Sequence, residues 1–219
     1  MNIPAARKSW TLVGLLIALL GIPLIATTFR LTLAPLSTDL TVAREVAIFA
    51  GAALLLCLVR RGESLPWSSV GLRRMPLAPG VIAVVLGLIA SAVAIALGLL
   101  LIQVSGIPFG HATPPHKLPL LVTCLVVLRA GIVEELTFRG YAIERLEALT
   151  GKRWLAVGLP LIFFAAFHSS QGAGGMLLAL LGGGVLSALY LWKRNLWVNM
   201  GVHFLVDFIP NVLLANMLS

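Results

Sequence analysis

The stretch AGIVEELTFRGYAIERL, residues 130–146, places two adjacent carboxylates, Glu134 and Glu135, and an arginine, Arg139, in a run that is otherwise apolar. The whole chain is apolar, because 59% of its 219 residues are hydrophobic, only 11% are charged and its mean hydropathy is +1.03. Soluble domains carry about 25% charged residues, so this chain lacks the polar surface to coat a globule in water. The composition predicts an integral membrane protein in which these three charges need a protein interior.

The apolar runs have the length and pattern of membrane-spanning helices. Several reach the ~20 residues that cross a bilayer core, and none alternates with the period of two that is typical of membrane-spanning strands. We therefore expect an all-α, polytopic transmembrane helical bundle. Charges and Pro/Gly clusters divide it into about seven spans, at residues 10–29, 45–59, 79–104, 118–139, 154–168, 175–192 and 195–217.

Lysine and arginine are distributed unevenly between the two ends of these spans. Alternate flanks hold eleven of them, whereas the opposite flanks hold only Arg30, Arg44 and Lys117. Cytoplasmic loops carry the excess of positive charge, so we expect a cytoplasmic N-terminus. The same bias explains the net charge of +8, so no nucleic-acid partner is needed to account for it. No basic cluster is interleaved with aromatic residues, as it would be in a groove that binds single-stranded nucleic acid.

Three further ionisable residues, His168, His203 and Asp207, lie in the later spans. Charged groups in a membrane face a protein interior and mark functional sites. Glu135 and Arg139 are four residues apart, so they share a helix face and can pair. Glu134 is rotated about 100° from Glu135 and can point elsewhere. His203 and Asp207 are also four apart and point into one space.

Distances along the helix axes place these groups at similar depths. The sequence LTGKR, residues 149–153, indicates a turn, and Glu134 and His168 both lie roughly 25 Å from it. His203 lies ~12 Å from the other basic end at Arg194. The two levels agree if the hairpin at 140–153 protrudes by ~10 Å. We therefore expect Glu134, His168, His203 and Asp207 to converge on one polar pocket.

Such a pocket supports hydrolysis of a peptide bond by either of two routes. In the first, a carboxylate beside an imidazole deprotonates a water, and a second histidine donates to the developing oxyanion. In the second, two histidines and a carboxylate hold a catalytic Zn2+ with an open coordination position. The metal ligands would then come from Glu134, His168, His203 and Asp207.

Three motifs, each on a separate apolar helix, carry a resemblance to a known family. EELTFR fits E-E-x-x-x-R, FAAFH (164–168) fits F-x-x-x-H, and HFLVD fits H-x-x-x-N/D. The ordered set resembles the CPBP family of intramembrane proteases, which includes the CAAX prenyl endopeptidases and the Abi-type bacteriocin-processing proteins. The resemblance covers residues 118–217 and implies a four-span catalytic core in residues 118–219. The first 117 residues do not match the family, and from their apolar runs we expect three N-terminal spans in residues 1–117. The resemblance also implies the plasma membrane of a bacterium or archaeon.

The resemblance implies a role for each motif residue. Glu134 would be the general base on water, with His168 sharing that water, while Glu135 and Arg139 would brace the site. His203 and Asp207 would act at the oxyanion. Asp207 stands where the prenyl-processing branch has asparagine, and an ionised aspartate cannot donate a hydrogen bond. It could instead orient His203, be protonated or ligate a metal.

The implied substrate is a peptide or protein, lipidated or membrane-associated, and Phe164 is a candidate wall for it. Two other functions stay open from the residues alone. The pocket could serve a transporter or proton relay, or the fold could act as a scaffold without cleavage. Glu135–Arg139 could be only a structural ion pair. We expect Glu144, Arg145 and Glu147 to form a solvated charged face.

Overall fold

The computed structural model describes residues 5–33, 37–109 and 118–217, and all regular structure in these ranges is helical. The predicted all-α fold is therefore confirmed. The helices join into seven rods across the described residues. Their segments are α1 Ala5–Leu16, η1 Ile17–Gly21, α2 Ile22–Leu33, α3 Thr38–Cys57, η2 Leu58–Gly62, η3 Trp67–Val70, α4 Leu77–Ser105, α5 Leu120–Arg129, η4 Ala130–Ile143, α6 Glu144–Thr150, α7 Arg153–Phe167, η5 Ser169–Gln171, α8 Gly172–Lys193, α9 Leu196–Phe208, η6 Ile209–Leu214 and α10 Ala215–Met217.

Five of these rods are long and apolar enough to cross a membrane, which agrees with the predicted integral membrane protein. A sixth helix, α7, is apolar but shorter. The remaining rod, α5–η4–α6, carries the charged motif and continues from Leu120 to Thr150, well past the end predicted at residue 139. The five long helices are Lys8–Leu33, Thr38–Gly62, Leu77–Ser105, Ser169–Lys193 and Leu196–Leu214.

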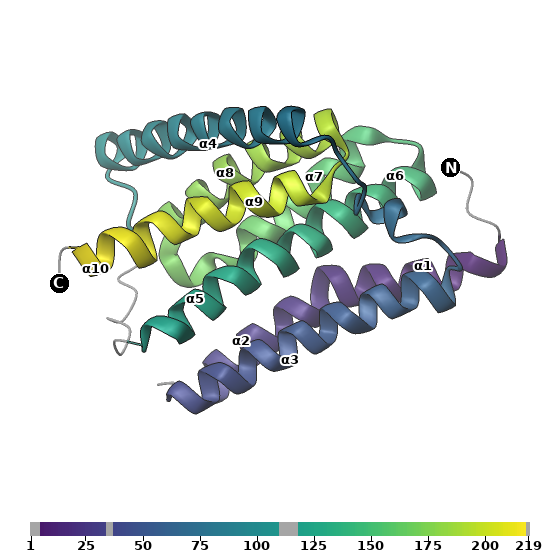
Figure 1. Ribbon diagram of the computed structural model, residues 1–219. Helices are drawn as coiled ribbons and strands as arrows, with labels where there is room; N and C mark the ends of the chain where they lie inside the picture. Colours follow the sequence, from purple (N-terminus) through teal and green to yellow (C-terminus); the bar gives the residue numbers. More distant parts are fainter. Residues whose placement is uncertain (1–4, 34–36, 110–117, 218–219) are drawn as a thin grey trace.

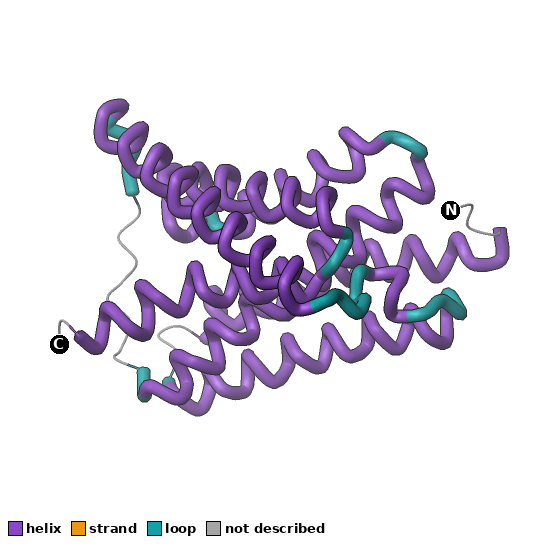
Figure 2. The backbone as a smooth tube through the Cα atoms, turned by 45° about the horizontal axis from the view of Figure 1, so that its top comes forward, coloured by secondary structure: helices purple, strands orange, loops and turns teal. Residues whose placement is uncertain are grey.

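The rods form a layered bundle with the charged motif inside it (Figure 1). Helix α4 packs on α8 and α9 at one side, whereas α3 packs on α5 and η4 at the other. Between these outer layers lie η4, α7, α8 and α9. The tube in Figure 2 shows that the described residues are almost all helical and that the last helix, α10, ends at the side of the bundle opposite the start of α1. The motif helix η4 is therefore shielded from lipid by the N-terminal rods.

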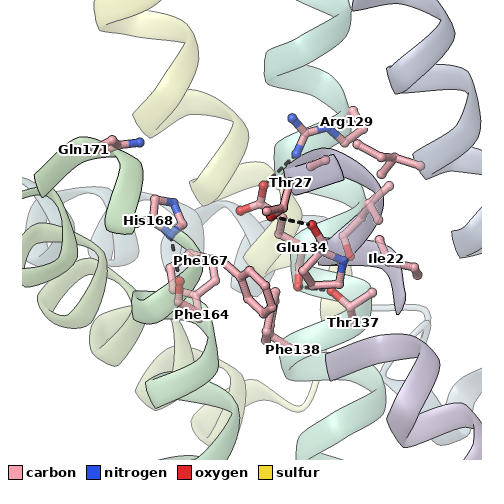
Figure 3. A pocket seen from close by; sticks show the side chains of 14 residues that line it. Ile22, Thr27, Arg129, Glu134, Thr137, Phe138, Phe164, Phe167, His168 and Gln171 are labelled. Atoms are coloured by element: carbon pink, nitrogen blue, oxygen red, sulfur yellow. Dashed lines mark hydrogen bonds and ion pairs between the residues drawn. The ribbon is translucent and has the colours of Figure 1, made fainter. Parts of the chain in front are cut away.

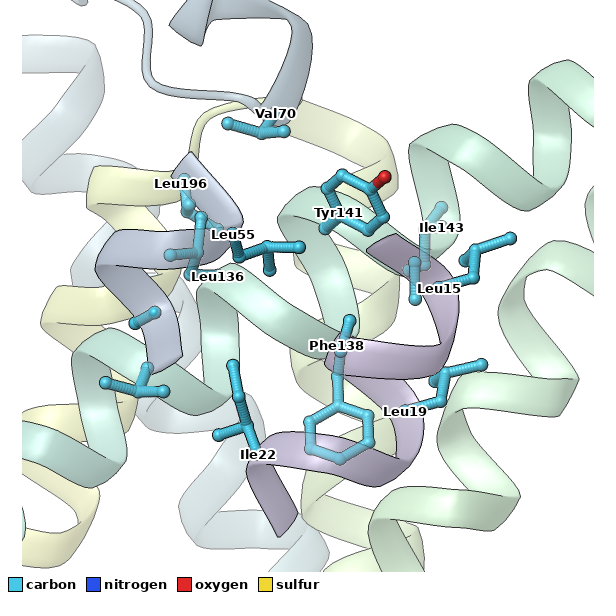
Figure 4. Packing of buried hydrophobic residues seen from close by; sticks show 14 of the residues in the cluster. Leu15, Leu19, Ile22, Leu55, Val70, Leu136, Phe138, Tyr141, Ile143 and Leu196 are labelled. Atoms are coloured by element: carbon cyan, nitrogen blue, oxygen red, sulfur yellow. The ribbon is translucent and has the colours of Figure 1, made fainter. Parts of the chain in front are cut away.

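One hydrophobic cluster joins the first rod to the motif helix (Figure 4). Leu15, Leu19 and Ile22 lie beside Phe138 of η4, and all of them are buried. Burying a large apolar side chain contributes about 1.5–3 kcal/mol relative to water, although lipid lowers this gain for helices inside a membrane. The N-terminal spans therefore share a core with the C-terminal ones. The boundary predicted at Lys117 lies outside the described residues, and the division into 1–117 and 118–219 stays a prediction.

The expected solvated charged face is wrong at Arg145, which is only 2% exposed. Its Nε donates to both carboxylate oxygens of Glu63, at 3.0 and 2.9 Å, and its Nη2 donates to Ser69 Oγ at 2.9 Å. Tyr141 adds a hydrogen bond to Glu63 at 2.9 Å. Glu63 follows η2 and Ser69 lies in η3, so this part of the chain supplies the partners of Arg145. A buried charge is tolerated when it is paired and hydrogen-bonded in this way.

Candidate active site

The motif helix departs from α-helical geometry along its whole length. Residues Ala130–Ile143 form the π-helix η4, in which hydrogen bonds join residues five apart. Side chains five apart are therefore neighbours, and Arg129 Nη1 lies 2.7 Å from Glu134 Oε1. An α-helical reading of the sequence does not predict this pair. π-Helical geometry is frequent at functional sites, and the 14-residue η4 holds both carboxylates of the motif.

Glu135 is fully buried and ties its own helix, η4, to α9. Its Oε1 accepts from Arg139 Nη1 at 2.6 Å and lies 2.7 Å from His203 Nδ1. Its Oε2 accepts from Asn199 Nδ2 at 3.1 Å. An ionised carboxylate can only accept a hydrogen bond. The Nδ1 atom of His203 therefore carries a hydrogen and donates it to Glu135. Glu135 therefore fixes the orientation of that imidazole.

Arg139 completes this brace on the side of α8. Its Nη2 donates to the carbonyl oxygen of Gly183 at 3.1 Å, and its guanidinium lies 4.4 Å from the centre of the Phe164 ring. A side chain at Gly183 would meet Arg139, because a Cβ built there lies 3.0 Å from Nη2. The expected pair of Glu135 and Arg139 is present and buried.

Glu134 points away from that brace, as expected, and is 22% exposed. Its Oε2 lies 3.9 Å from His203 Nε2, and Asp207 Oδ2 lies 3.5 Å from the same nitrogen. His203 thus presents Nδ1 to Glu135 and Nε2 to the other two carboxylates. The structure brings Glu134, His203 and Asp207 together at one point between η4 and α9.

His168 lies across a cavity from Glu134 rather than in direct hydrogen-bond contact with it (Figure 3). It ends α7, and its Nδ1 lies 2.8 Å from the carbonyl oxygen of Phe164. If Nδ1 donates to that carbonyl, Nε2 is the acceptor nitrogen. The rings of Phe164 and His168 are 4.7 Å apart, so the buried Phe164 forms part of the cavity wall.

Two cavities meet at these side chains. One has a volume of about 170 Å³ and extends toward α2 and α3, where Ile22, Thr27 and Ile48 line it. The other has a volume of about 610 Å³, lies among α4, α5, α8 and α9, and reaches His203 and Asp207. Both exceed the ~30 Å³ that a water occupies in the liquid. The residues common to both cavities are Arg129, Glu134, Phe164, His168 and Gln171.

This geometry lies within a region that matches a known family. Residues 116–209 match the family described as Type II CAAX prenyl endopeptidase Rce1-like. This part of the chain is similar to the Rce1-like family. The match confirms the resemblance to intramembrane proteases predicted from the three motifs, all of which fall inside it. No curated protein matches the chain, and no solved structure matches it.

Residues outside the Rce1-like region also reach the site, and sequence reasoning missed them. Glu45 of α3 is fully buried, and its Oε2 accepts from Arg129 Nε at 2.6 Å while Arg44 lies 2.6 Å from Oε1. The second span was predicted to begin at residue 45, so Glu45 was read as a boundary. The helix begins at Thr38, two turns earlier, and this places Glu45 inside the bundle.

Sequence reasoning also missed Asn199, which lies within the Rce1-like region. It is buried and donates to both Glu135 and the carbonyl oxygen of Leu186, at 3.1 and 2.7 Å. Asn199, His203 and Asp207 recur every four residues, so they share one face of α9. This spacing was the available signal for Asn199.

The side chains as placed do not meet the requirement of a catalytic Zn2+ site, which needs three protein ligands around one point. Among the described residues, no group of three or more His, Cys, Asp and Glu side chains could hold a metal ion. His203 Nδ1 is occupied by Glu135, and His168 lies across the cavity. No step below is routed through a metal, and Zn2+ stays a prediction.

Proposed function

We propose that the chain is an intramembrane endopeptidase in which Glu134 activates a water for attack on a peptide carbonyl. The observation that carries the proposal is the position of Glu134, which is held by Arg129, faces His203 and opens on two cavities within the region of a peptidase family. A carboxylate partly withdrawn from water is suited to act as a general base.

The residues divide the reaction as follows. Water occupies the space between Glu134 and His168, and Glu134 accepts its proton as the oxygen attacks the carbonyl carbon. His203 carries a proton on Nε2 and donates it as a hydrogen bond to the oxyanion. Glu134 then passes its proton to the leaving amine as the C–N bond breaks. Asp207, 3.5 Å from Nε2, orients His203 before substrate binds.

The two cavities suggest where the substrate lies. The larger cavity accommodates a peptide or protein segment, lipidated or membrane-associated, with Phe164 as its wall beside the scissile bond. The smaller cavity, lined mostly by apolar side chains from α2, α3 and η4, accepts one apolar side chain. We further propose that the N-terminus is cytoplasmic and that the membrane is the plasma membrane of a bacterium or archaeon. Cleavage would then occur inside that membrane.

The test is cleavage of a fluorogenic peptide library, with and without a C-terminal prenyl group, by the full chain in liposomes. Glu134→Gln and His168→Ala should each lower the rate by about 10²–10⁴-fold. Glu147→Gln, which removes a partly exposed carboxylate far along the same rod, is the matched control and should cleave normally. Thermal unfolding checks that each variant is folded.

Two results would overturn the proposal. The first is unchanged cleavage by folded Glu134→Gln protein. The second is proton-driven uptake of a solute by a chain that cleaves no peptide, which would favour a transporter. A chelator added to the wild-type assay addresses the Zn2+ prediction separately, because a metal-independent enzyme keeps its rate.

A further inference from the structure

A second concave site lies away from the active site, between the N-terminal end of α4 and the start of α9. It is a groove with a volume of about 520 Å³. Arg73 and Arg74 lie at one part of its lining, and Val81, Val85 and Trp197 line another. None of these residues takes part in the proposed cleavage reaction. The groove therefore needs an explanation of its own.

The charge at this groove is positive and is not neutralised within it. Both arginines are exposed, and no acidic side chain is among its described lining residues. Arg73 Nε donates to the carbonyl oxygen of Ser68 at 2.9 Å, which engages one of its donors and leaves its charge without a counter-ion there. An anion at the groove would complete this pattern.

The segment that carries the arginines is held in place by α9. Asn195 is 2% exposed, and its Nδ2 donates to the carbonyl oxygen of Arg73 at 2.8 Å. The backbone N–H of Leu196 donates to the carbonyl oxygen of Gly71 at 2.8 Å. Gly71 has a φ of +82°, which glycine adopts without strain. These hydrogen bonds fix the backbone that carries Arg73, so the groove has a defined shape.

The rest of the groove is apolar and faces outward. Leu77 is 83% exposed, Trp197 is 62% exposed, and Val81 and Val85 are also exposed. Tryptophan is enriched at the membrane–water interface. A positive end joined to an apolar, outward-facing channel complements a molecule with an anionic head and a hydrocarbon tail.

We propose that this groove binds one anionic phospholipid. Arg73 and Arg74 hold its phosphate, and one acyl chain lies along Val81, Val85 and Trp197. Basic pockets between membrane helices bind anionic lipid headgroups in this manner. The groove lies at the end of the bundle where most of the lysines and arginines gather, so the lipid comes from that leaflet. The proposal is independent of the cleavage reaction.

The test measures lipid binding by native mass spectrometry of the purified full chain in detergent. Phosphatidylglycerol and phosphatidylcholine with the same acyl chains serve as probes. We expect wild-type protein to prefer phosphatidylglycerol roughly tenfold. Arg73→Gln/Arg74→Gln should remove the preference, and Val81→Trp should lower the binding of both lipids by filling the channel. Arg60→Gln/Arg61→Gln is the matched control, since these two exposed arginines lie at the same end but outside the groove.

Each outcome decides for or against the site. Equal binding of the two lipids by wild-type protein overturns the proposal, and so does an equal loss in both arginine double variants, which would indicate general surface attraction. Competition with glycerol phosphate distinguishes a lipid headgroup from a free phosphate as the ligand. If glycerol phosphate displaces the lipid fully at comparable concentration, the groove recognises a free anion and the acyl-chain contact is wrong.

Discussion

Two buried ionic clusters differ in how completely their charges are enclosed. The anchor cluster (Glu63, Arg145 and Tyr141) joins the chain before η3 to the rod that contains η4 and α6, and its Glu63 is fully buried with hydrogen bonds to both oxygens. The site cluster (Arg129, Glu134 and His203) also joins distant helices. Its Glu134, however, is 22% exposed and lines two cavities.

The difference separates a structural role from a chemical one. A carboxylate whose oxygens are all engaged in fixed bonds has no capacity left for water or substrate. A carboxylate beside a cavity keeps that capacity. Burial of charge in a membrane protein is therefore only the first criterion for a functional site, and room next to the charged atom is the second. The following changes test this distinction.

The largest effect on stability is expected in the anchor cluster. Glu63→Ala leaves Arg145 buried without its carboxylate, and breaking a buried pair in this way costs about 3–5 kcal/mol. The free energy of unfolding, measured by denaturant titration in detergent, should fall by this amount. Glu147→Ala removes a carboxylate from a partly exposed pair and should cost under about 1 kcal/mol. Similar losses in both variants would contradict the assigned anchoring role.

A smaller but catalytic effect is expected at Glu45, which connects the N-terminal spans to the site cluster. Glu45→Gln weakens the hold on Arg129 from one side, so the guanidinium shifts and Glu134, which is hydrogen-bonded to it at 2.7 Å, loses its fixed position. Displacement of this kind can lower turnover by up to about 10²-fold. The measurement is kcat and KM in liposomes.

The matched control for Glu45 is Asp39→Asn, which changes an exposed carboxylate in the first turn of the same helix. If Glu45→Gln and Asp39→Asn have the same kcat, the N-terminal spans do not position the base. A higher KM with unchanged kcat would indicate that Glu45 contributes to substrate binding instead.

Asn199 should have a more modest effect because it acts on His203 only through Glu135. Asn199→Ala removes one donor to the buried Glu135, which costs about 1–3 kcal/mol and should lower kcat by roughly tenfold. KM should not change. Stability and kcat are measured on the same preparation. A drop in stability with unchanged kcat would show that Asn199 supports the fold without orienting His203.

Sequence reasoning reached the parts of the site that depend on spacing along one helix. The pair Glu135–Arg139 and the shared face of His203 and Asp207 follow from residues four apart. The turning of Glu134 away from the pair follows from the rotation of about 100° between adjacent residues. The depth estimate placed His168 near Glu134, and both line the same cavities. These are local relations, or relations across a single hairpin.

The missed contacts depend on geometry that the sequence does not display. Arg129 reaches Glu134 because the rod becomes π-helical at Ala130, which makes residues five apart neighbours. Arg145 is buried because the segment near Glu63 covers it, although the two are 82 residues apart in sequence. The fold class and the family resemblance followed from composition and motifs, whereas the partners of buried charges required the tertiary structure.

The smallest effect is expected at Glu147, in the charged hairpin beyond the membrane-spanning segments. Partial burial there opposes ionisation, but hydrogen bonds from Arg194 and Arg153 outweigh it and hold the pKa of Glu147 below its usual range. A lowered pKa in the folded state means that the stabilisation is present above the pKa of the unfolded chain, about 4.3, and is lost as the pH falls through the folded-state pKa.

The measurement is the difference in unfolding free energy between wild type and Glu147→Gln across pH 7 to 3. The wild-type advantage should be constant, at most about 1 kcal/mol, down to about pH 5 and should then shrink. It should also shrink with added salt, because the pair is partly exposed to solvent. An advantage that grows on acidification would show that Glu147 is destabilised by its surroundings. In that case the pairs of Glu147 do not fasten the hairpin, and the anchor cluster and the contacts of Glu144 with Tyr190 and Arg194 hold this end of the rod.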